Sequence, residues 1–382
     1  MHISNINKQT SNPLQHRSDV AKTRSSKSTI INETLITPKI EIPNKWPKII
    51  SAIELYKMDI PSTKFHIEGL LAEGLIILGG APKYGKSMFG LQMGLKISSG
   101  GEFMGLKVNQ TGVLYLALED CWGRLQTRMN IMNSNKPPSP LFYYSIEGLT
   151  IENGLIDWLT KEVKEKPEIK IIIIDTFTRI RDSRKPGVGW YEYDYKSVNI
   201  IKEAMDKIGV SVILIHHTTK TKDTDDPFNN LTGTSGIVGA ADTILILDKL
   251  SRGATQASLH VTGRDIDTEE HILCFNKEKC LWQYRGVAEE VEQKEKILAY
   301  QSSDIVKTIK VLLSESENNK WTGFGKNLID AGKRIFDISL ASSSRELSVE
   351  LARLKDLLYQ QDGIIFDSRS NGTGGQKIIF RR

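Results

Sequence analysis

The chain has 382 residues, of which 39% are hydrophobic and 25% are charged, and its formal net charge is +5. This composition is typical of a soluble globular protein with one large domain or two modest ones. No apolar run approaches the roughly 20 residues that span a bilayer, and the start lacks the apolar stretch of a secretory signal, so we expect no membrane segment. Cys121, Cys274 and Cys280 form neither a CxxC pair nor an even disulfide set, which favours a reducing, cytoplasmic setting.

Residues 1–44 are rich in Ser, Thr, Asn and Lys without sustained periodicity, which predicts a disordered basic tail. Residues 1–50 hold eight Lys or Arg and three Asp or Glu, so the whole net charge of +5 resides there. A basic arm suits contact with phosphate groups, but the same composition also suits a solvated tail. The net charge alone therefore does not establish nucleic-acid binding.

From residue 45 to residue 285, short apolar runs alternate with helical patterns. Runs of Ile, Val and Leu without polar alternation predict strands that are buried on both faces of a parallel sheet. The gaps between the first four runs are long enough for the crossovers that parallel strands need, so we predict a three-layer α/β domain with a mainly parallel sheet. The predicted strands are Leu75–Gly79, Val113–Leu118, Ile171–Ile174, Val210–Ile215, Thr243–Leu247 and Ala257–Val261.

After this domain, a polar helical stretch predicts a linker over residues 286–303. Residues 304–382 then change character, because two helical patterns precede two short strand-like runs around a glycine-rich turn. This outline predicts a small α+β, winged-helix-like domain. The helices are expected at Ile305–Leu313 and Ser344–Gln361, and the strand-like runs at Gly363–Asp367 and Lys377–Phe380.

The strongest motif is GAPKYGKS, which fits G-x-x-x-x-G-K-[ST] between the first predicted strand and a predicted helix at Ser87–Ser98. Gly80 and Gly85 allow backbone N–H groups to surround phosphate oxygens. The Lys86 ammonium suits the β- and γ-phosphates, and the Ser87 hydroxyl suits Mg²⁺, so we expect ATP and Mg²⁺ as cofactors. The predicted cofactor-binding residues are Gly80, Ala81, Pro82, Lys83, Tyr84, Gly85, Lys86, Ser87 and Met88.

Three later strands also end in side chains that suit phosphate chemistry, at the sheet edge where α/β folds bind ligands. Glu119 is a candidate base for the attacking water. Asp175 ends the run IIIID and is expected to support Mg²⁺ together with Ser87. His216 and His217 end the fourth run, and only one of them should face the nucleotide because adjacent side chains of a strand point to opposite faces.

Three further segments are candidates for contacts with other molecules. Arg264, just past the last run, could reach the γ-phosphate of a neighbouring subunit, or pair with Asp265 or Asp267. The segment Asp182–Tyr195 mixes basic and aromatic residues, which suits backbone contact and base stacking. The loop Thr218–Gly236 is rich in Gly, Asn and Asp and contains Lys220 and Lys222, so it is expected to be mobile. Packing or simple solvation is the alternative for both segments.

Together these motifs resemble the RecA-like ATPases of the RepA-type plasmid replication helicase group, which are related to DnaB-type helicases. The matching segments are GAPKYGKS, LALED with Arg124, Leu125 and Arg128 after it, IIIIDT, LIHHTTK, GTSGIVGAAD and VTGRD, over about residues 50–285.

The resemblance implies that Glu119 is the catalytic base, that Asp175 supports Mg²⁺, and that His217 senses the γ-phosphate. It also implies sheet order 5-1-4-3-2, ring-shaped hexamers, and single-stranded DNA in the central channel. Leu231 and Thr232 stand where some relatives have a basic residue, so Arg264 is the better candidate for an arginine that acts in trans.

The predicted function is that of an ATP hydrolase, a DNA helicase or replication ATPase of a plasmid, phage or other mobile element. A replication initiator or another replication protein is a further expected partner. The alternatives are a non-translocating RecA-like ATPase, such as a switch, loader or recombination accessory, and a binding protein that uses ATP only to set its shape. The carboxy-terminal domain suits DNA or protein docking, with candidate contacts Arg345, Arg353, Lys355, Arg369 and Lys377.

Overall fold

The structure is a computed structural model that describes residues 49–60, 62–184, 186–218, 226–231, 235–251, 253–370 and 376–382. The predicted basic tail, residues 1–44, lies outside the described residues. The chain divides into two compact units, Met1–Ile60 and Pro61–Arg382. Within the described ranges, no helix has the length and apolar character needed to cross a membrane.

In the first unit the described residues contain the short helix α1 (Ala52–Lys57). Its start is fixed by a capping box, in which the Glu54 backbone N–H donates to Ser51 Oγ and the Ser51 N–H donates to the Glu54 carboxylate. These two bonds satisfy backbone donors that the first helical turn leaves without a partner.

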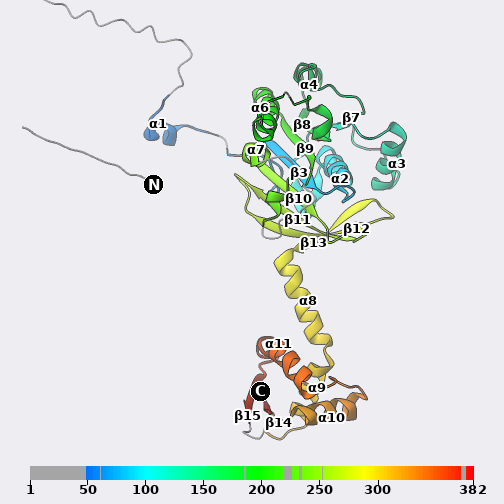
Figure 1. Cartoon of the computed structure of the whole chain (residues 1–382), viewed down its shortest axis with the longest axis vertical. Helices are drawn as coiled ribbons and strands as arrows, with labels where there is room; N and C mark the ends of the chain where they lie inside the picture. Colours follow the sequence, from blue (N-terminus) through cyan, green and yellow to red (C-terminus); the bar gives the residue numbers. More distant parts are fainter. Residues whose placement is uncertain are drawn as a thin grey trace, which may run out of the picture. The chain divides into compact units, whose positions relative to one another are not determined.

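The second unit is built on a nine-stranded sheet (Figure 1). Its strands are β3 (Leu75–Gly80), β6 (Gly112–Ala117), β7 (Phe142–Ser145), β8 (Ile169–Asp175), β9 (Ser211–His217), β10 (Thr243–Asp248), β11 (Gln256–Gly263), β12 (Glu269–Asn276) and β13 (Leu281–Val287). They lie in the order β13-β12-β11-β10-β3-β9-β8-β6-β7. The five strands from β10 to β6 in this order pair in parallel, which confirms the expected order 5-1-4-3-2.

The sheet continues beyond these five strands at both edges. The sixth predicted run lies in β11, which pairs antiparallel with β10, and β12 and β13 extend this antiparallel part. At the other edge β7 pairs in parallel with β6. The sequence analysis missed β7, β12 and β13 because their side chains are only partly buried and form no continuous apolar run.

Helices cover both faces of the sheet, so the predicted three-layer architecture is confirmed. One hydrophobic cluster joins the sheet to α2 (Lys86–Ser99) and α3 (Trp122–Met132). The cluster on the opposite face joins it to α4 (Leu155–Glu165), α5 (Phe177–Ile180), α6 (Trp190–Ile208) and α7 (Ser235–Ala240). A short 3-10 turn, η1 (Pro227–Asn230), precedes α7. A small sheet in the order β2-β1-β5-β4 adds β1 (Phe65–Ile67), β2 (Leu71–Ala72), β4 (Gly101–Phe103) and β5 (Leu106–Val108).

After β13 the chain forms the helix α8 (Ala288–Ser302) and then a small α+β region with its own hydrophobic cluster. The elements of this region are α9 (Asp304–Ser314), β14 (Lys320–Phe324), α10 (Gly325–Phe336), α11 (Ser344–Asp362), β15 (Ile365–Ser370) and β16 (Gln376–Arg381). Its three strands form an antiparallel sheet in the order β14-β16-β15. The sequence analysis missed β14 and α10, and its domain boundaries at 285, 303 and 304 stay predictions.

Candidate nucleotide site

The loop between β3 and α2 depends on two glycines that lie against neighbouring strands. A Cβ atom at Gly80 would stand 2.6 Å from the Leu247 carbonyl oxygen. Gly85 has a φ of 97°, and a Cβ there would stand 2.9 Å from the ring of Trp282. Both the left-handed backbone at Gly85 and the close approaches favour glycine, so the loop is held tightly at the carboxyl ends of the parallel strands.

Lys86 opens α2 and is buried, with 5% of its surface exposed. Its Nζ donates to the carbonyl oxygens of Gly80 (2.6 Å) and Ala81 (3.0 Å) and lies 3.2 Å from His217 Nδ1. Burial lowers the pKa of Lys86 to about 8, although the nearby carboxylates of Asp175 and Glu119 oppose this change. The ammonium therefore lies among the strand ends that the sequence singled out.

Asp175 is the last residue of β8 and is buried beside Ser87. Burial raises the pKa of the Asp175 carboxyl group, and hydrogen bonds from Ser87 and Tyr115 oppose the rise. The Tyr115 hydroxyl donates to Asp175 Oδ2 at 2.9 Å. Tyr115 was missed by the sequence analysis, because a tyrosine inside an apolar strand has the pattern of a core residue.

Glu119 follows β6 and is exposed at the same edge of the sheet. The Thr176 hydroxyl donates to Glu119 Oε1 at 3.2 Å. The next residue, Asp120, forms salt bridges with Arg124 and Arg128 and accepts a hydrogen bond from the Cys121 backbone, while Cys121 itself is the N-cap of α3. Asp120 is thus fixed by the first turns of α3, whereas Glu119 faces solvent.

The two adjacent histidines at the end of β9 have different surroundings. His217 contacts Lys86, and burial lowers the pKa of its imidazole, with a further decrease from the Lys86 charge and an opposing effect of Glu119. His216 is buried, and its ring packs edge-on against Phe177 with the ring centres 5.5 Å apart. The structure thus places His217, and not His216, beside Lys86.

Arg264 does not lie with the other candidate residues. Because β11 is antiparallel to β10, Gly263 at its end pairs with Thr243 at the start of β10, at the opposite edge of the sheet from Gly80. The Arg264 side chain is 63% exposed and lies 3.2 Å from Asp242 Oδ1. It therefore pairs with Asp242 and not with Asp265 or Asp267, the two partners that the sequence had offered.

A cavity of about 210 Å³ adjoins the loop on its β10 side. Trp282 forms one wall, donates from Nε1 to the Gly85 carbonyl oxygen at 3.2 Å, and packs against Phe275 with ring centres 5.1 Å apart. Lys249 lies over the Trp282 ring, with Nζ 5.5 Å from its centre. The sequence analysis missed this cavity, because Trp282 is far from Gly85 along the chain and forms no motif with it.

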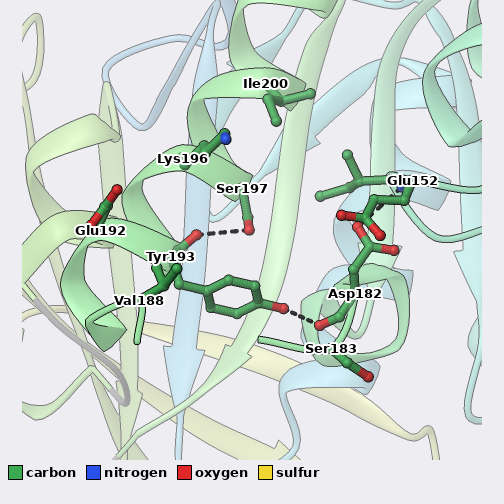
Figure 2. A pocket seen from close by; sticks show the side chains of 10 residues that line it. Glu152, Asp182, Ser183, Val188, Glu192, Tyr193, Lys196, Ser197 and Ile200 are labelled. Atoms are coloured by element: carbon green, nitrogen blue, oxygen red, sulfur yellow. Dashed lines mark hydrogen bonds between the residues drawn. The ribbon is translucent and has the colours of Figure 1, made fainter. Parts of the chain in front are cut away.

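The segment Asp182–Tyr195 is only partly a loop, since α6 begins at Trp190. Trp190 and Tyr191 are each more than half exposed, and Arg184 lies over the Trp190 ring. Figure 2 shows the hollow on the inner side of this segment, where the Tyr193 hydroxyl donates to the Asp182 carbonyl oxygen. Its lining residues are Ile151, Glu152, Asp182, Ser183, Val188, Glu192, Tyr193, Lys196, Ser197 and Ile200.

Three of these lining residues are acids and one is a lysine, so the hollow would repel phosphate. Only the outward aromatic side of the segment suits a nucleic acid. Lys185 and residues 219–225 and 232–234, which include Lys220 and Lys222, lie outside the described residues.

A sheet of order 5-1-4-3-2 with a phosphate-binding loop after its central strand defines a RecA-like P-loop ATPase fold. Residues 47–223, just under half of the chain, match the family described as AAA domain. No curated protein matches the sequence.

Two solved structures resemble the chain. One is an ATPase domain with 15% identity and a TM-score of 0.45, and the match covers 55% of this chain and 84% of that one. The other is the structure of a DnaB-like replicative helicase and its interactions with primase, which has 15% identity and a TM-score of 0.45. The match covers 55% of this chain and spans 58% of that second chain.

Proposed function

We propose that this protein is an ATP hydrolase that uses hydrolysis to move along single-stranded DNA, as a DNA helicase or replication ATPase in a ring-shaped hexamer. The observation that carries the proposal is the cluster of Lys86, Glu119, Asp175 and His217 at one edge of a parallel sheet. The resemblance to RepA-type helicases and the AAA domain match support the same class of activity.

Each side chain of the cluster has a role that its surroundings suit. Lys86 exchanges the carbonyl oxygens of Gly80 and Ala81 for the β- and γ-phosphates of ATP. Glu119, exposed at the strand end, orients the attacking water and accepts its proton. His217 lies beside Lys86, where its ring detects whether the γ-phosphate is present.

The residues present fit a magnesium ion. The Ser87 hydroxyl and the Asp175 carboxylate are adjacent oxygen groups, which is the donor type that Mg²⁺ prefers. They would hold the ion directly or through water, and the bound ion would neutralise phosphate charge. The adjoining cavity with Phe275, Lys249 and Trp282 is the proposed place for the nucleoside, since it offers aromatic faces beside the loop.

The proposed contact with single-stranded DNA is the aromatic side of the start of α6. Trp190, Tyr191 and Tyr195 are exposed, and Tyr191 and Tyr195 are stacked with ring centres 6.0 Å apart. Exposed rings next to Arg184 suit base stacking and backbone contact. Assembly into a hexamer, and docking of a replication initiator or another replication protein, belong to the same proposal.

Two variants test hydrolysis. Lys86→Ala removes the ammonium and should abolish ATPase activity. Glu119→Gln should retain ATP binding but slow hydrolysis by roughly 10²–10⁴-fold, since it lacks the base. Glu102→Gln, an exposed acid on β4, is the matched control and should hydrolyse ATP normally. Unchanged turnover in Glu119→Gln would remove this residue as the base.

A strand-displacement assay with ATP and a forked duplex separates the two remaining functions. A helicase should displace the strand, and sizing with ATP and single-stranded DNA should show a hexamer. ATPase activity that single-stranded DNA stimulates without any unwinding would instead favour a non-translocating switch, loader or recombination accessory.

A further inference from the structure

The small sheet formed by β14, β16 and β15 has one buried face and one exposed face. Its strands pair in register, so three side chains stand in a row across the sheet at each level. The rows that contain Ile378 and Phe380 point into the hydrophobic cluster of this region. Because neighbouring residues of a strand point to opposite faces, the alternate rows form the outer face.

Three rows make up this outer face, which we name the outer sheet face. The first row is Phe324, Lys377 and Arg369, the second is Thr322, Ile379 and Asp367, and the third is Lys320, Arg381 and Ile365. Among these nine residues, only Ile379 and Asp367 are not fully exposed.

The outer sheet face carries four cations and a single acid. Asp367 is that acid, and it pairs with Arg381 at 3.1 Å. Among the described residues, no carboxylate forms a salt bridge with Lys320, Arg369 or Lys377. The three unpaired cations are spaced along both edges and the centre of the sheet, so they present positive charge over its whole width.

Apolar side chains lie between these cations. Phe324, 41% exposed, shares a row with Lys377 and Arg369, and Ile365, 38% exposed, shares a row with Lys320 and Arg381. Exposed apolar and aromatic groups gain little from the backbone of a duplex, whose bases are stacked inside. They suit unpaired bases, which stack on aromatic rings while the phosphates contact cations.

We propose that the outer sheet face is a binding surface for single-stranded nucleic acid, in which Lys320, Arg369 and Lys377 contact phosphates and Phe324 stacks on a base. This surface is separate from the ATPase site and from the start of α6. It gives the chain a means of holding a strand whether or not nucleotide is bound.

The other candidate surface of this region is the exposed side of α11, which is less suitable. Arg353 pairs with Glu350 at 2.6 Å, and Glu346, Glu350 and Asp356 alternate with the basic residues of the helix. Its charges therefore largely cancel, whereas those of the outer sheet face do not. This difference makes α11 a matched internal control.

The test uses the full-length chain without nucleotide and measures anisotropy of a labelled oligo(dT) over a range of salt concentrations. Arg369→Ala combined with Lys377→Ala should weaken binding about tenfold and lower the slope of log K against log salt by roughly 1.4, because each lost phosphate contact contributes about 0.7. Phe324→Leu should weaken binding by about tenfold with an unchanged slope, because stacking is lost and charge is not.

Arg353→Ala combined with Lys355→Ala removes the same charge from α11 and should leave the affinity and slope as in the wild type. The proposal is overturned if the α11 variant loses binding to the same degree, if Arg369→Ala/Lys377→Ala binds oligo(dT) normally, or if it loses only duplex binding. Basal ATPase activity, measured without DNA, should be unchanged in every one of these variants. Failure of this proposal is thus distinguishable from failure of the proposed ATPase, which Lys86→Ala and Glu119→Gln report.

Discussion

Lys86 is held by groups that a bound phosphate would replace. Its ammonium donates to two carbonyl oxygens and contacts His217, and the side chain is almost fully withdrawn from solvent. Burial disfavours the charged form, so the pKa is lowered from 10.5 to about 8. The triphosphate would bring negative charge to the ammonium and raise this pKa again.

ATP binding should therefore become weaker above pH 8. Below this pH, Lys86 is already protonated in the free protein, and affinity should not depend on its titration. Above it, binding must take up a proton, so the affinity should fall by up to about tenfold per pH unit. Calorimetry at pH 7, 8 and 9 measures this change, and proton uptake should appear as a dependence of the heat on the buffer at pH 9.

Lys86→Arg is the control for this pH dependence, since a guanidinium stays protonated throughout the range. Any affinity that this variant retains should be the same at pH 8 and pH 9. A wild-type affinity that is equally constant would show that Lys86 does not titrate near pH 8.

Tyr115 should act as a positioning residue for the magnesium-binding carboxylate. Tyr115→Phe removes only the hydroxyl that donates to Asp175. Loss of a partner behind a metal-binding carboxylate typically costs 10–100-fold in metal affinity or activity, so the Mg²⁺ concentration for half-maximal ATPase activity should rise by about this factor. Activity at saturating Mg²⁺ should recover, which a merely misfolded variant would not show.

Tyr144→Phe is a matched control for Tyr115→Phe. Its ring packs against Tyr115 with ring centres 6.2 Å apart, and its buried hydroxyl has no hydrogen-bond partner among the described residues. Removal of this hydroxyl should leave the Mg²⁺ dependence unchanged. Equal effects of the two substitutions would assign Tyr115 to packing alone.

The residues of the cluster that could be predicted are those that end strands. Lys86, Glu119, Asp175 and His217 each follow an apolar run, and parallel strands bring such positions to one edge of the sheet. Tyr115 and Trp282 could not be found in this way, because they contact Asp175 and Gly85 through the packing of segments that are distant along the chain. Neither residue has a local pattern that distinguishes it from a core aromatic.

Among the secondary-structure elements, strands buried on both faces were predictable and partly exposed strands were not. The β8 run is almost wholly buried, so its apolar character is continuous. The β12 strand alternates buried and half-buried residues, and its segment also contains charged residues such as Glu269. The missed helix α10 begins with a glycine and contains another, which lowers its helix propensity.

Asp242 joins three elements at the edge of the sheet that lies opposite the nucleotide site. It accepts the Leu75 backbone N–H at the start of β3 at 2.9 Å, forms a salt bridge with Lys202 of α6, and pairs with Arg264 after β11. Its side chain is only 15% exposed. One carboxylate thus connects β3, α6 and the segment before β10.

Asp242→Ala should destabilise the protein by about 3–5 kcal/mol, because it leaves a buried N–H and a partly buried ammonium without their partner. Asp242→Asn can still accept from Leu75 and should cost less. Lys202→Met, which removes one cation only, is a further comparison. Urea titrations of the three variants measure these differences, and equal midpoints for Asp242→Ala and Asp242→Asn would show that the connection to β3 contributes nothing.

For the whole molecule, the position of Arg264 determines how it can act. It lies at the sheet edge opposite Lys86, and its exposed side chain is directed to Asp242. It therefore does not reach the nucleotide site of its own chain. If it contributes to hydrolysis, it must do so at the site of another copy, as an assembly of subunits allows.

Mixing two inactive variants tests this role. Arg264→Ala has an intact phosphate-binding loop, whereas Lys86→Ala has an intact arginine. Each should be strongly impaired alone, and loss of an arginine that acts in trans costs roughly 10³–10⁵-fold in rate. In mixed assemblies, an Arg264→Ala subunit beside a Lys86→Ala subunit regains a complete site, so ATPase activity should exceed the sum of the two separate activities.

Arg285→Ala, an exposed arginine on β13, serves as the control for the loss of surface charge and should hydrolyse ATP normally. Mixtures must be prepared under conditions that allow subunits to exchange, and sizing should confirm that the assembly is retained. If activity is lost in Arg264→Ala but does not return on mixing, the residue acts through its salt bridge with Asp242. In that case Arg264→Ala should also lower the urea midpoint, as the Asp242 variants do, because the same contact at the sheet edge has been removed.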